Sequence, residues 1–476
     1  MKSISEYLDE DYRKWKNNPY ISIYENGKFQ SKSFGTVIDN VRDMAKTLLQ
    51  MGYQGKNIMI YSENSYEWTV LYLSIMGYVG TCIPVDKEWT EYDMSHALSA
   101  IDVVVIFYSK AKEERIARLK EVYPDVKYLC IEEVFLEMIQ QGSKIAECPN
   151  GQRDLGQTVM VLFTSGTTNI PKAIPLTQSN LFHNWNTLFQ RTPMTEKDVS
   201  YLFLPLNHVY SGVANFLYSI VSGMQIYLCH DMSNMVEEMM LVRPTVVCMV
   251  PLILKRIYTM ISEEVLKMLQ GIRFLYCGGS FTEIELKKYF IKNGVHLLEA
   301  YGTTETSSVI ALDLLGDYNI ESNGVIMESL DVKILNPDED GVGEILVKGG
   351  SVSKGYLSRK DSYSEFDENG YYHTGDLGRL DNSRHLYLKG RKRRVMITAN
   401  GKNVYLDEIE ELLLKNPKIV KVKAYEENYH VAAEIIGNLT LEEAKVFVDE
   451  INKKLPSFKE ICNIYVKEDV LGGRIK

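Results

Sequence analysis

Residues 159–177 read VMVLFTSGTTNIPKAIPLT, and in this stretch a polar, hydroxyl-rich loop separates two apolar runs. The runs at residues 159–163 and 173–176 each predict a short buried strand, so the stretch predicts a strand–loop–strand hairpin. Backbone N–H groups, hydroxyls and one ammonium group are the groups that phosphate oxygens bind. The loop therefore fits either a phosphate-binding tip or a polar surface turn.

The loop differs from the Walker A pattern of phosphate-binding loops, GxxxxGK[ST]. Pro171 stands at the position of the second glycine, and Ala173 follows the lysine where the pattern requires Ser or Thr. A Walker A loop also opens a helix, whereas this loop leads into a predicted strand. The next helix is predicted over residues 180–189, with Thr177 or Ser179 at its start.

Strand-like and helix-like segments alternate through the first two thirds of the chain. The segments at residues 57–61, 81–85 and 101–107 are typical of strands, and the apolar residues 68–78 are typical of a helix. Since this βαβ order is typical of parallel sheets covered by helices, we expect an α/β fold in which helices sandwich the sheets. The 476 residues are enough for about three domain-sized units.

The pattern changes after Gly390. A basic run, RKRR, is followed by segments that alternate as strand, helix, strand, strand, helix and strand, an order typical of a small α+β domain. Thr440 and Glu443 have the spacing of a capping box, which predicts a helix start. We expect a large domain over residues 1–389 and a small one over residues 390–476. The basic run alone does not distinguish a functional segment from a solvated linker.

Composition and charge narrow the class of protein. A net charge of −10 speaks against a nucleic-acid partner. Seven cysteines without a CxxC pair predict reduced thiols and no zinc site, as is usual in the cytoplasm. The charged N-terminus lacks the apolar core of a signal peptide, and the longest apolar run, residues 246–254, is too short to span a bilayer. We therefore expect a cytoplasmic protein with no integral membrane segment.

Two further polar segments carry acidic residues. YGTTET at residues 301–306 contains Glu305, a carboxylate of the kind that ligates Mg²⁺ together with phosphate oxygens. YHTGD at residues 372–376 ends in Asp376, which is suited to accept hydrogen bonds from ribose hydroxyls. Each signal is weak alone, since a Gly-Asp pair is most often a turn.

Taken together and in order, six motifs resemble the adenylate-forming superfamily, which comprises acyl- and aryl-CoA synthetases, peptide-synthetase adenylation domains and luciferases. The form NGKNVY, with PKAI in the loop, leans toward the acyl-CoA synthetase branch. The resemblance covers the chain from about residue 30 to its end. The motifs are TSGTTNIPKA (164–173), PLNHVYSG (205–212), YGTTETS (301–307), GEILVKGGSVSKGYL (343–357), YHTGDLG (372–378) and GRKRRVMITANGKNVYLDEIE (390–410).

The resemblance implies that the chain binds ATP and Mg²⁺ and activates a carboxylic acid. In this family the carboxylate attacks the α-phosphorus of ATP, giving acyl-AMP and pyrophosphate, and a thiol then takes the acyl group. By resemblance, Thr303 contacts the α-phosphate and Glu305 ligates Mg²⁺. Asp376 binds the ribose, with Arg391 nearby. The other implied contacts are, for the β- and γ-phosphates, Thr164, Ser165, Gly166, Thr167, Thr168 and Lys172, and, around the adenine, Gly278, Gly279, Ser280, Glu299, Ala300, Tyr301 and Gly302.

The resemblance also implies that the small domain is a mobile lid. It would rotate after the first step about a hinge with Arg393 at the pivot, and Gly401 would then enter the site beside the pantetheine arm of the acceptor, since glycine allows close backbone approach. His208 matches the family's gate between the acyl site and the thiol channel. The alternative for His208 is a hydrogen-bonded histidine of the core.

The last residues depart from the family pattern. Relatives carry a catalytic lysine in a Gly-Lys-Ile pattern, whereas this chain ends Gly473-Arg474-Ile475-Lys476. Arginine keeps the positive charge on a planar fork rather than a point charge. We expect Arg474 to bridge the carboxylate and the α-phosphate, with Lys476 as a substitute if the tail shifts.

The acid and the acceptor are defined only by class. Amino-acid-activating relatives place an aspartate just after the PLxH-type segment, and residues 209–213 contain no acid. Small apolar residues at positions 212–214 favour an aliphatic or aryl carboxylic acid. The acceptor is expected to be CoA; the alternatives are a carrier protein's phosphopantetheine or an amine. A nucleotide-binding protein with impaired adenylation is the third possibility, motivated by Arg474 alone.

Overall fold

The computed structural model describes most of the chain. Of Arg393, Ile397, Asn403 and Glu468 it describes only the main chain. The described residues are 1–147, 149–152, 154–164, 171–316, 319–357, 365–397, 403–427, 430–453, 455–456 and 459–468.

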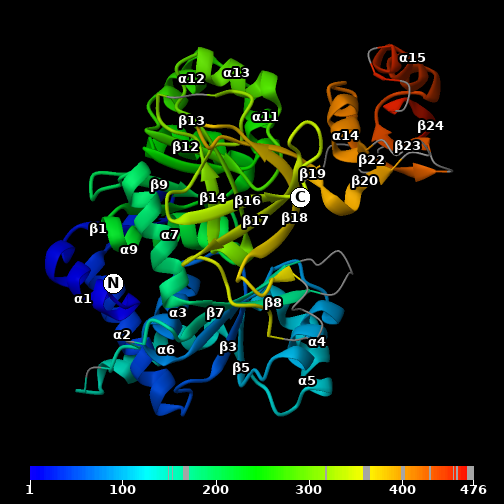
Figure 1. The fold of residues 1–476 in the computed structure, drawn as a ribbon. Helices are drawn as coiled ribbons and strands as arrows, with labels where there is room; N and C mark the ends of the chain where they lie inside the picture. The colour runs from blue at the N-terminus through cyan, green and yellow to red at the C-terminus, as the bar shows by residue number, and fades with distance from the viewer. Residues whose placement is uncertain are drawn as a thin grey trace. The chain divides into compact units, whose positions relative to one another are not determined.

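The chain divides into two compact units (Figure 1). Unit 1 comprises residues 1–331 and 347–372, and unit 2 comprises residues 332–346 and 373–476. The division is therefore not a single cut in the sequence. The domain boundary that we predict before Gly390 falls inside unit 2. That the residues from Gly390 onward form a mobile lid stays a prediction.

The hairpin stretch at residues 159–177 belongs to a six-stranded sheet of unit 1. Neighbouring strands pair in parallel, except that β7 and β8 form the predicted antiparallel hairpin. Apolar side chains of α4 (Glu91–Ala100) and α5 (Glu113–Val122) pack on one face of this sheet. Figure 1 shows α2 (Phe34–Gln50), α3 (Tyr66–Ser74) and α6 (Ile131–Ser143) across the sheet from them. The strand order is β6 (Lys127–Cys130), β5 (Val105–Tyr108), β3 (Asn57–Tyr61), β4 (Thr81–Pro84), β7 (Thr158–Thr164) and β8 (Lys172–Thr177).

A second, nine-stranded sheet completes the framework of unit 1. Its central strands are parallel, and the pairs β1–β2, β13–β14 and β14–β15 are antiparallel. The strand order is β15 (Val325–Ile326), β14 (Ser308–Leu312), β13 (Leu297–Thr303), β12 (Phe274–Gly278), β11 (Val246–Met249), β9 (Val199–Leu202), β10 (Gln225–Leu228), β1 (Pro19–Glu25) and β2 (Lys28–Ser33). The other α-helices of unit 1 are α1 (Ile4–Trp15), α7 (Gln178–Arg191), α8 (Val209–Ser211), α9 (Ser219–Ser222), α10 (Met235–Val242), α11 (Pro251–Thr259), α12 (Glu263–Gln270) and α13 (Ile284–Lys292).

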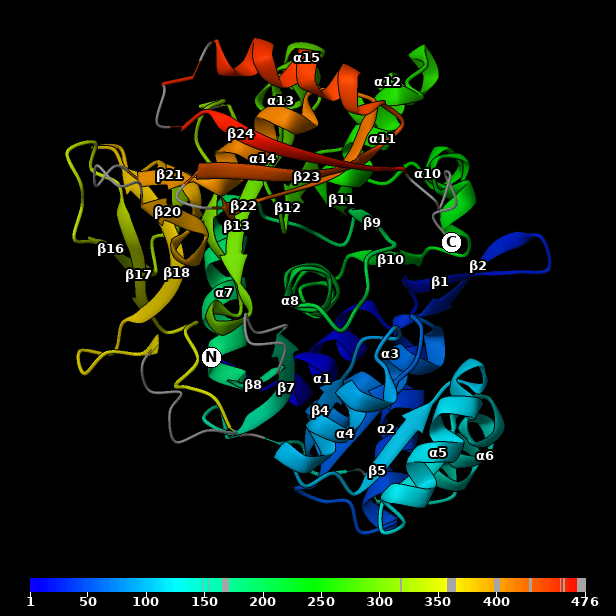
Figure 2. The same cartoon turned by 90° about the vertical axis from the view of Figure 1, so that its right-hand side faces the viewer.

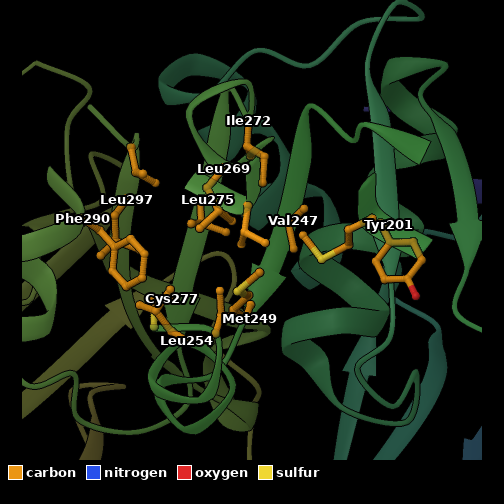
Figure 3. Packing of buried hydrophobic residues seen from close by; sticks show 14 of the residues in the cluster. Tyr201, Val247, Met249, Leu254, Leu269, Ile272, Leu275, Cys277, Phe290 and Leu297 are labelled. Atoms are coloured by element: carbon orange, nitrogen blue, oxygen red, sulfur yellow. The ribbon is translucent and has the colours of Figure 1, made fainter. Parts of the chain in front are cut away.

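Close packing of apolar side chains holds the helices on the nine-stranded sheet (Figure 3). Val247 and Met249 of β11 and Leu275 of β12 are fully buried beneath Leu254 of α11 and Phe290 of α13. Burying one such side chain stabilises the fold by about 1.5–3 kcal/mol. The parallel strands are apolar on both faces, which is why they read as short continuous runs in the sequence.

Unit 2 contains the small α+β arrangement that the sequence predicts. Figure 2 shows α15 alongside β24, and a single core joins α14 and α15 to the strands. Thr440 and Glu443 form the predicted capping box at the start of α15. The elements are β20 (Val395–Ile397), β21 (Asn403–Tyr405), α14 (Leu406–Leu414), β22 (Ile419–Glu427), β23 (His430–Gly437), α15 (Leu441–Asn452) and β24 (Ile461–Glu468). A four-stranded sheet precedes them in the order β16 (Leu330–Leu335), β17 (Gly343–Gly349), β18 (Tyr372–Leu380) and β19 (Leu386–Arg391).

None of the helices in the described residues is long and apolar enough to cross a membrane. The apolar run at residues 246–254 is divided between β11 and α11, and Pro251 begins that helix. Proline is favoured at this position because the first helical N–H needs no partner within the helix.

Helix α1 buries an ionisable side chain without a full set of partners. Asp11 is 3% exposed, and its Oδ2 atom has no hydrogen-bond partner in the described residues. Burial raises the pKa of Asp11 well above its usual range, and repulsion from Glu10 adds to this, while Lys14 opposes it. The folded state therefore holds this proton more tightly than the unfolded state. Stability is lost as the pH rises from the unfolded pKa of about 4 through the folded pKa.

Asp11→Asn is expected to raise the free energy of unfolding at pH 7 by about 1–3 kcal/mol, because it removes the cost of burying an ionisable carboxyl without changing the side-chain shape. The gain should shrink as the pH falls below about 4, where the wild-type carboxyl becomes protonated in both states. Thermal unfolding at a series of pH values measures this. Asp125→Asn, at an exposed position, is the matched control. A pH-independent gain, or no gain, would contradict the assignment.

Candidate functional site

The β7–β8 hairpin carries the predicted phosphate-binding loop between its strands. Thr164, the last residue of β7, pairs with Lys172, the first residue of β8. Residues 159–162 of β7 and Ala173 and Ile174 of β8 are 0–2% exposed. Since both strands are buried in the sheet, the ends of the loop are fixed in position. The hairpin is confirmed, and with it the difference from Walker A, in which a helix follows the loop.

Lys172 lies among charged and aromatic side chains. Its ammonium group forms an ion pair with Glu365 and lies 4.9 Å from the ring centre of Tyr356. The Tyr356 hydroxyl contacts the other oxygen of Glu365 and lies 3.0 Å from Oε1 of Glu305. Lys172 and Glu305, predicted to face phosphate and metal respectively, therefore share Tyr356 as a neighbour.

Glu305 sits in a tight turn that follows β13. The turn (Thr304–Thr306) is a single 3₁₀ turn, and the side-chain oxygen of Thr306 accepts a 3.2 Å hydrogen bond from the Thr303 N–H. The residue Glu305 is 7% exposed. Burial raises the pKa of its carboxyl, while hydrogen bonds that include one from Tyr356 oppose the rise. Gly302 is required here, because a Cβ at this position would overlap the carbonyl oxygen of Ser308.

The predicted adenine segments meet at one edge of the nine-stranded sheet. β12 and β13 are parallel, and Gly278 pairs with Ala300. The carboxyl ends of the two strands therefore place residues 278–280 beside residues 299–302. Ligands of open α/β sheets bind in the crevice at this edge. A Cβ at Gly278 would crowd the carbonyl oxygen of Ala300, so glycine permits the close pairing of the strands.

Glu299 is committed to contacts within the protein. Its Oε2 atom lies 3.1 Å from the Lys287 ammonium, and its Oε1 atom accepts a 2.9 Å hydrogen bond from Asn323. Lys287 also pairs with Asp313 at 3.0 Å and donates to the carbonyl of Ser322 at 2.9 Å. Burial raises the pKa of Glu299, and the charge of Lys287 opposes this. A nucleotide contact of the Glu299 side chain stays a prediction.

His208 is not a core histidine. Its side chain is 55% exposed, and its Nε2 atom lies 3.6 Å from Oδ2 of Asp86. Hydrogen bonding from His208 lowers the pKa of Asp86. The residues after His208 form α8 and a π-helical segment (Gly212–Leu217) whose residues Val213 and Ala214 are buried. The accessible ring is compatible with the predicted gate, which stays a prediction.

Asp376 and Arg391 form an ion pair within unit 2. They face each other across β18 and β19, and Nε of Arg391 lies 2.7 Å from Oδ1 of Asp376. Asp376 is 6% exposed, whereas the Arg391 side chain is 59% exposed. The structure therefore places Arg391 beside Asp376, the residue predicted to bind the ribose. Ribose binding by Asp376 stays a prediction.

Several predicted site residues lie outside what the structure describes. Their roles stay predictions based on the sequence. They are Ser165, Gly166, Thr167, Thr168, Gly401, Arg474 and Lys476, and the side chain of Arg393.

Sequence reasoning assigns no role to Tyr356 or Glu365, although both touch the site. Tyr356 lies within the motif at residues 343–357, but it is one of 31 tyrosines, and nothing in the pattern predicts what its hydroxyl contacts. Glu365 lies outside the quoted motifs. No pattern in the sequence indicates that Glu365 pairs with Lys172, because the two residues are far apart in the chain.

Among proteins of known function, acid–CoA ligases are similar to this chain. The 2-succinylbenzoate–CoA ligase of Bacillus mycoides (strain KBAB4) is 29% identical over 77% of this chain and 80% of that protein. The long-chain-fatty-acid–CoA ligase FadD15 of Mycobacterium bovis is 23% identical over 85% of this chain and 77% of that protein.

Solved structures have the same fold. O-succinylbenzoate Coenzyme A synthetase (MenE) from Bacillus subtilis, in complex with AMP, superposes with a TM-score of 0.84 at 22% identity, covering 98% of this chain and 95% of that one. ATP-bound MatB from Rhodopseudomonas palustris superposes with a TM-score of 0.86 at 21% identity and the same coverage. At these identities the likeness shows the fold alone, and it confirms the predicted α/β fold with a smaller C-terminal part.

The family is defined by sequence over most of the chain. Residues 8–357 match the model of the family described as AMP-binding enzyme. The match includes the hairpin stretch, the Glu305 turn and Tyr356. It confirms the resemblance to adenylate-forming enzymes, and the chain belongs to the AMP-binding enzyme family.

Proposed function

We propose that this chain is an AMP-forming acid–CoA ligase. It uses ATP to convert a carboxylic acid to acyl-AMP with release of pyrophosphate, and it then transfers the acyl group to the thiol of CoA. The observation that carries the proposal is that a cation and a buried carboxylate, Lys172 and Glu305, both lie beside Tyr356. Lys172 offers a cation to phosphate, and the buried carboxylate of Glu305 offers oxygen to a metal ion. A metal-bound polyphosphate needs both.

Glu305 has the chemistry that Mg²⁺ requires. Mg²⁺ is usually held by one or two carboxylates together with phosphate oxygens and water. No group of three or more His, Cys, Asp or Glu side chains suited to a metal occurs among the described residues, and a nucleotide-borne Mg²⁺ needs none. Glu305 would hold the ion, which would neutralise charge on the phosphates when bound. CoA would be the second substrate rather than a resident group.

The chain's own residues address the main obstacle to the first step, the repulsion between a carboxylate and a triphosphate. Lys172 would neutralise the outer phosphates, and Arg474 would draw the acid's carboxylate toward the α-phosphorus. Thr303 lies in the turn that fixes Glu305 and would contact the α-phosphate. Such positioning and charge neutralisation account for most of the catalysis in phosphoryl and nucleotidyl transfer.

The acid is proposed to be aliphatic or aryl. The segment after His208 contains no charged residue up to position 217, and Val213 and Ala214 are buried. Related ligases are named for an aryl acid and for long-chain fatty acids. An amino acid would require a carboxylate for its ammonium group, and this segment offers none.

A pyrophosphate-release assay with a panel of acids tests the proposal. We expect release with at least one aliphatic or aryl acid and none with amino acids, and a new thioester when CoA is added. Arg474→Ala should abolish the release, because the cation at the α-phosphate is lost; unchanged release would show that another group serves. A thioester on a carrier protein but not on CoA would favour the carrier alternative. ATP binding without pyrophosphate release from any acid would favour impaired adenylation.

A further inference from the structure

Four side chains of unit 1 form a connected row, here called the Tyr356 cluster: Lys172, Glu365, Tyr356 and Glu305. Lys172 pairs with one oxygen of Glu365, and the Tyr356 hydroxyl contacts the other. The same hydroxyl lies 3.0 Å from Oε1 of Glu305. The row thus connects the start of β8 to the turn after β13, 133 residues apart in the sequence.

The main chain around Tyr356 is fixed to both ends of this row. The Leu357 N–H donates to the Ala173 carbonyl in β8 at 3.0 Å. The Ser353 N–H donates to the Glu305 carbonyl at 2.7 Å, and its hydroxyl donates to the Pro175 carbonyl at 2.8 Å. Because the segment is held at both sides, the Tyr356 hydroxyl has a fixed place between Lys172 and Glu305.

The carboxylates of Glu365 and Glu305 compete for the single hydroxyl proton of Tyr356. A phenol carries one proton, so Tyr356 can donate to Glu365 or to Glu305 but not to both. Because the hydroxyl also contacts Glu365, which Lys172 holds, the hydrogen bond from Tyr356 to Oε1 of Glu305 has a competing acceptor and is weakened. Releasing Glu365 would free the hydroxyl for Glu305.

The charges indicate what releases Glu365. Lys172 is the lysine of the phosphate-binding stretch, and Glu365 now supplies the anionic oxygens that phosphate would supply. The two side chains are 25% and 24% exposed, so their ion pair is accessible to an incoming anion. A triphosphate reaching Lys172 would meet the negative charge of Glu365, and like charges in contact repel each other.

We propose that Glu365 occupies Lys172 until the triphosphate replaces it, and that the freed Tyr356 hydroxyl then donates to Glu305 and positions that carboxylate. This rests on the proposed function, in which Lys172 meets phosphate and Glu305 meets Mg²⁺. Tyr356 is a positioning residue, and Glu365 is a competitor of the nucleotide. Binding of phosphate at Lys172 and positioning of the Glu305 carboxylate are thereby coupled through the hydroxyl proton of Tyr356.

Two variants of the full chain separate the parts of this proposal. Glu365→Gln keeps the shape and removes the competing charge, so it should bind ATP about fivefold more tightly in Mg²⁺-free buffer, the gain expected from a partly exposed ion pair. Tyr356→Phe should need about tenfold more Mg²⁺ for half-maximal tightening of ATP binding, because Glu305 is no longer held. Isothermal titration with ATP at a series of Mg²⁺ concentrations measures both effects.

Matched controls remove one charge or one hydroxyl elsewhere. Glu368→Gln is three residues from Glu365 at an exposed position, and Tyr92→Phe lies at a tyrosine that is 66% exposed. Both should bind ATP like the wild type. Thermal unfolding confirms that each variant is folded, and Glu365→Ala repeats the test with a different side chain.

The outcomes distinguish this proposal from the proposed function. Wild-type protein that binds no ATP would overturn the proposed function itself. Wild-type protein that binds ATP, with equal or weaker binding in both Glu365 variants, would overturn the competition. An unchanged Mg²⁺ requirement in Tyr356→Phe would overturn the positioning of Glu305.

Discussion

Lys287→Met is expected to lower the free energy of unfolding by about 3–5 kcal/mol, the cost of removing one partner from a buried ion pair. The Lys287 side chain is 1% exposed and lies 3.1 Å from Glu299 and 3.0 Å from Asp313. Methionine fills about the same volume but removes the cation that pairs with both buried carboxylates. Urea unfolding followed by tryptophan fluorescence measures the loss.

The adjacent residue supplies a matched control. Lys288 is 50% exposed and pairs with Glu285 on the surface of α13 at 2.8 Å. Lys288→Met removes the same charge from the same helix and should change stability little, since exposed pairs are screened by water and salt. Equal losses in the two variants would show that the buried cluster contributes no more than a surface pair.

A second variant identifies the cause of the loss. Adding Glu299→Gln to Lys287→Met removes one of the stranded carboxylates and should recover part of the lost stability. Burial already raises the pKa of Glu299, and Lys287 opposes that rise. Without the lysine, the Glu299 carboxyl should therefore take up a proton more readily. No recovery would indicate that lost packing, rather than unpaired charge, dominates.

Local pattern was sufficient to predict the elements that carry the site. The apolar runs at residues 159–163 and 173–176 define the hairpin because each is short, continuous and bounded by a polar loop. The spacing of Thr440 and Glu443 defines the start of α15 for a similar reason, since capping depends on residues close in sequence.

Side-chain partners between distant segments could not be predicted in this way. A lysine on a charged helix is normally exposed, and nothing near Lys287 in the sequence indicates that β13 brings Glu299 against it. The neighbours of Glu305 are likewise set by chain segments about 50 residues away. The motifs thus identified the candidate site residues, whereas only the structure identified the oppositely charged side chains that pair with them.

Glu305→Gln is expected to lower the rate of pyrophosphate release by about 100-fold or more, the usual cost of removing a charged group that acts on the reacting phosphates. Glutamine keeps the shape and can still accept a hydrogen bond from the Tyr356 hydroxyl, which lies 3.0 Å from Oε1 of Glu305. The variant should therefore fold normally, because it replaces a buried carboxylate by a neutral group. Release measured at a series of Mg²⁺ concentrations is the test.

The Mg²⁺ series separates a metal ligand from a structural residue. If Glu305 holds the ion, higher Mg²⁺ should recover part of the activity of Glu305→Gln, whereas Glu321→Gln, at an exposed position, should match the wild type throughout. If Glu305 only supports its turn, the variant should lose thermal stability and should not respond to Mg²⁺. Because Tyr356 would still donate to the amide oxygen, the first outcome would assign the effect to the missing charge rather than to a lost hydrogen bond.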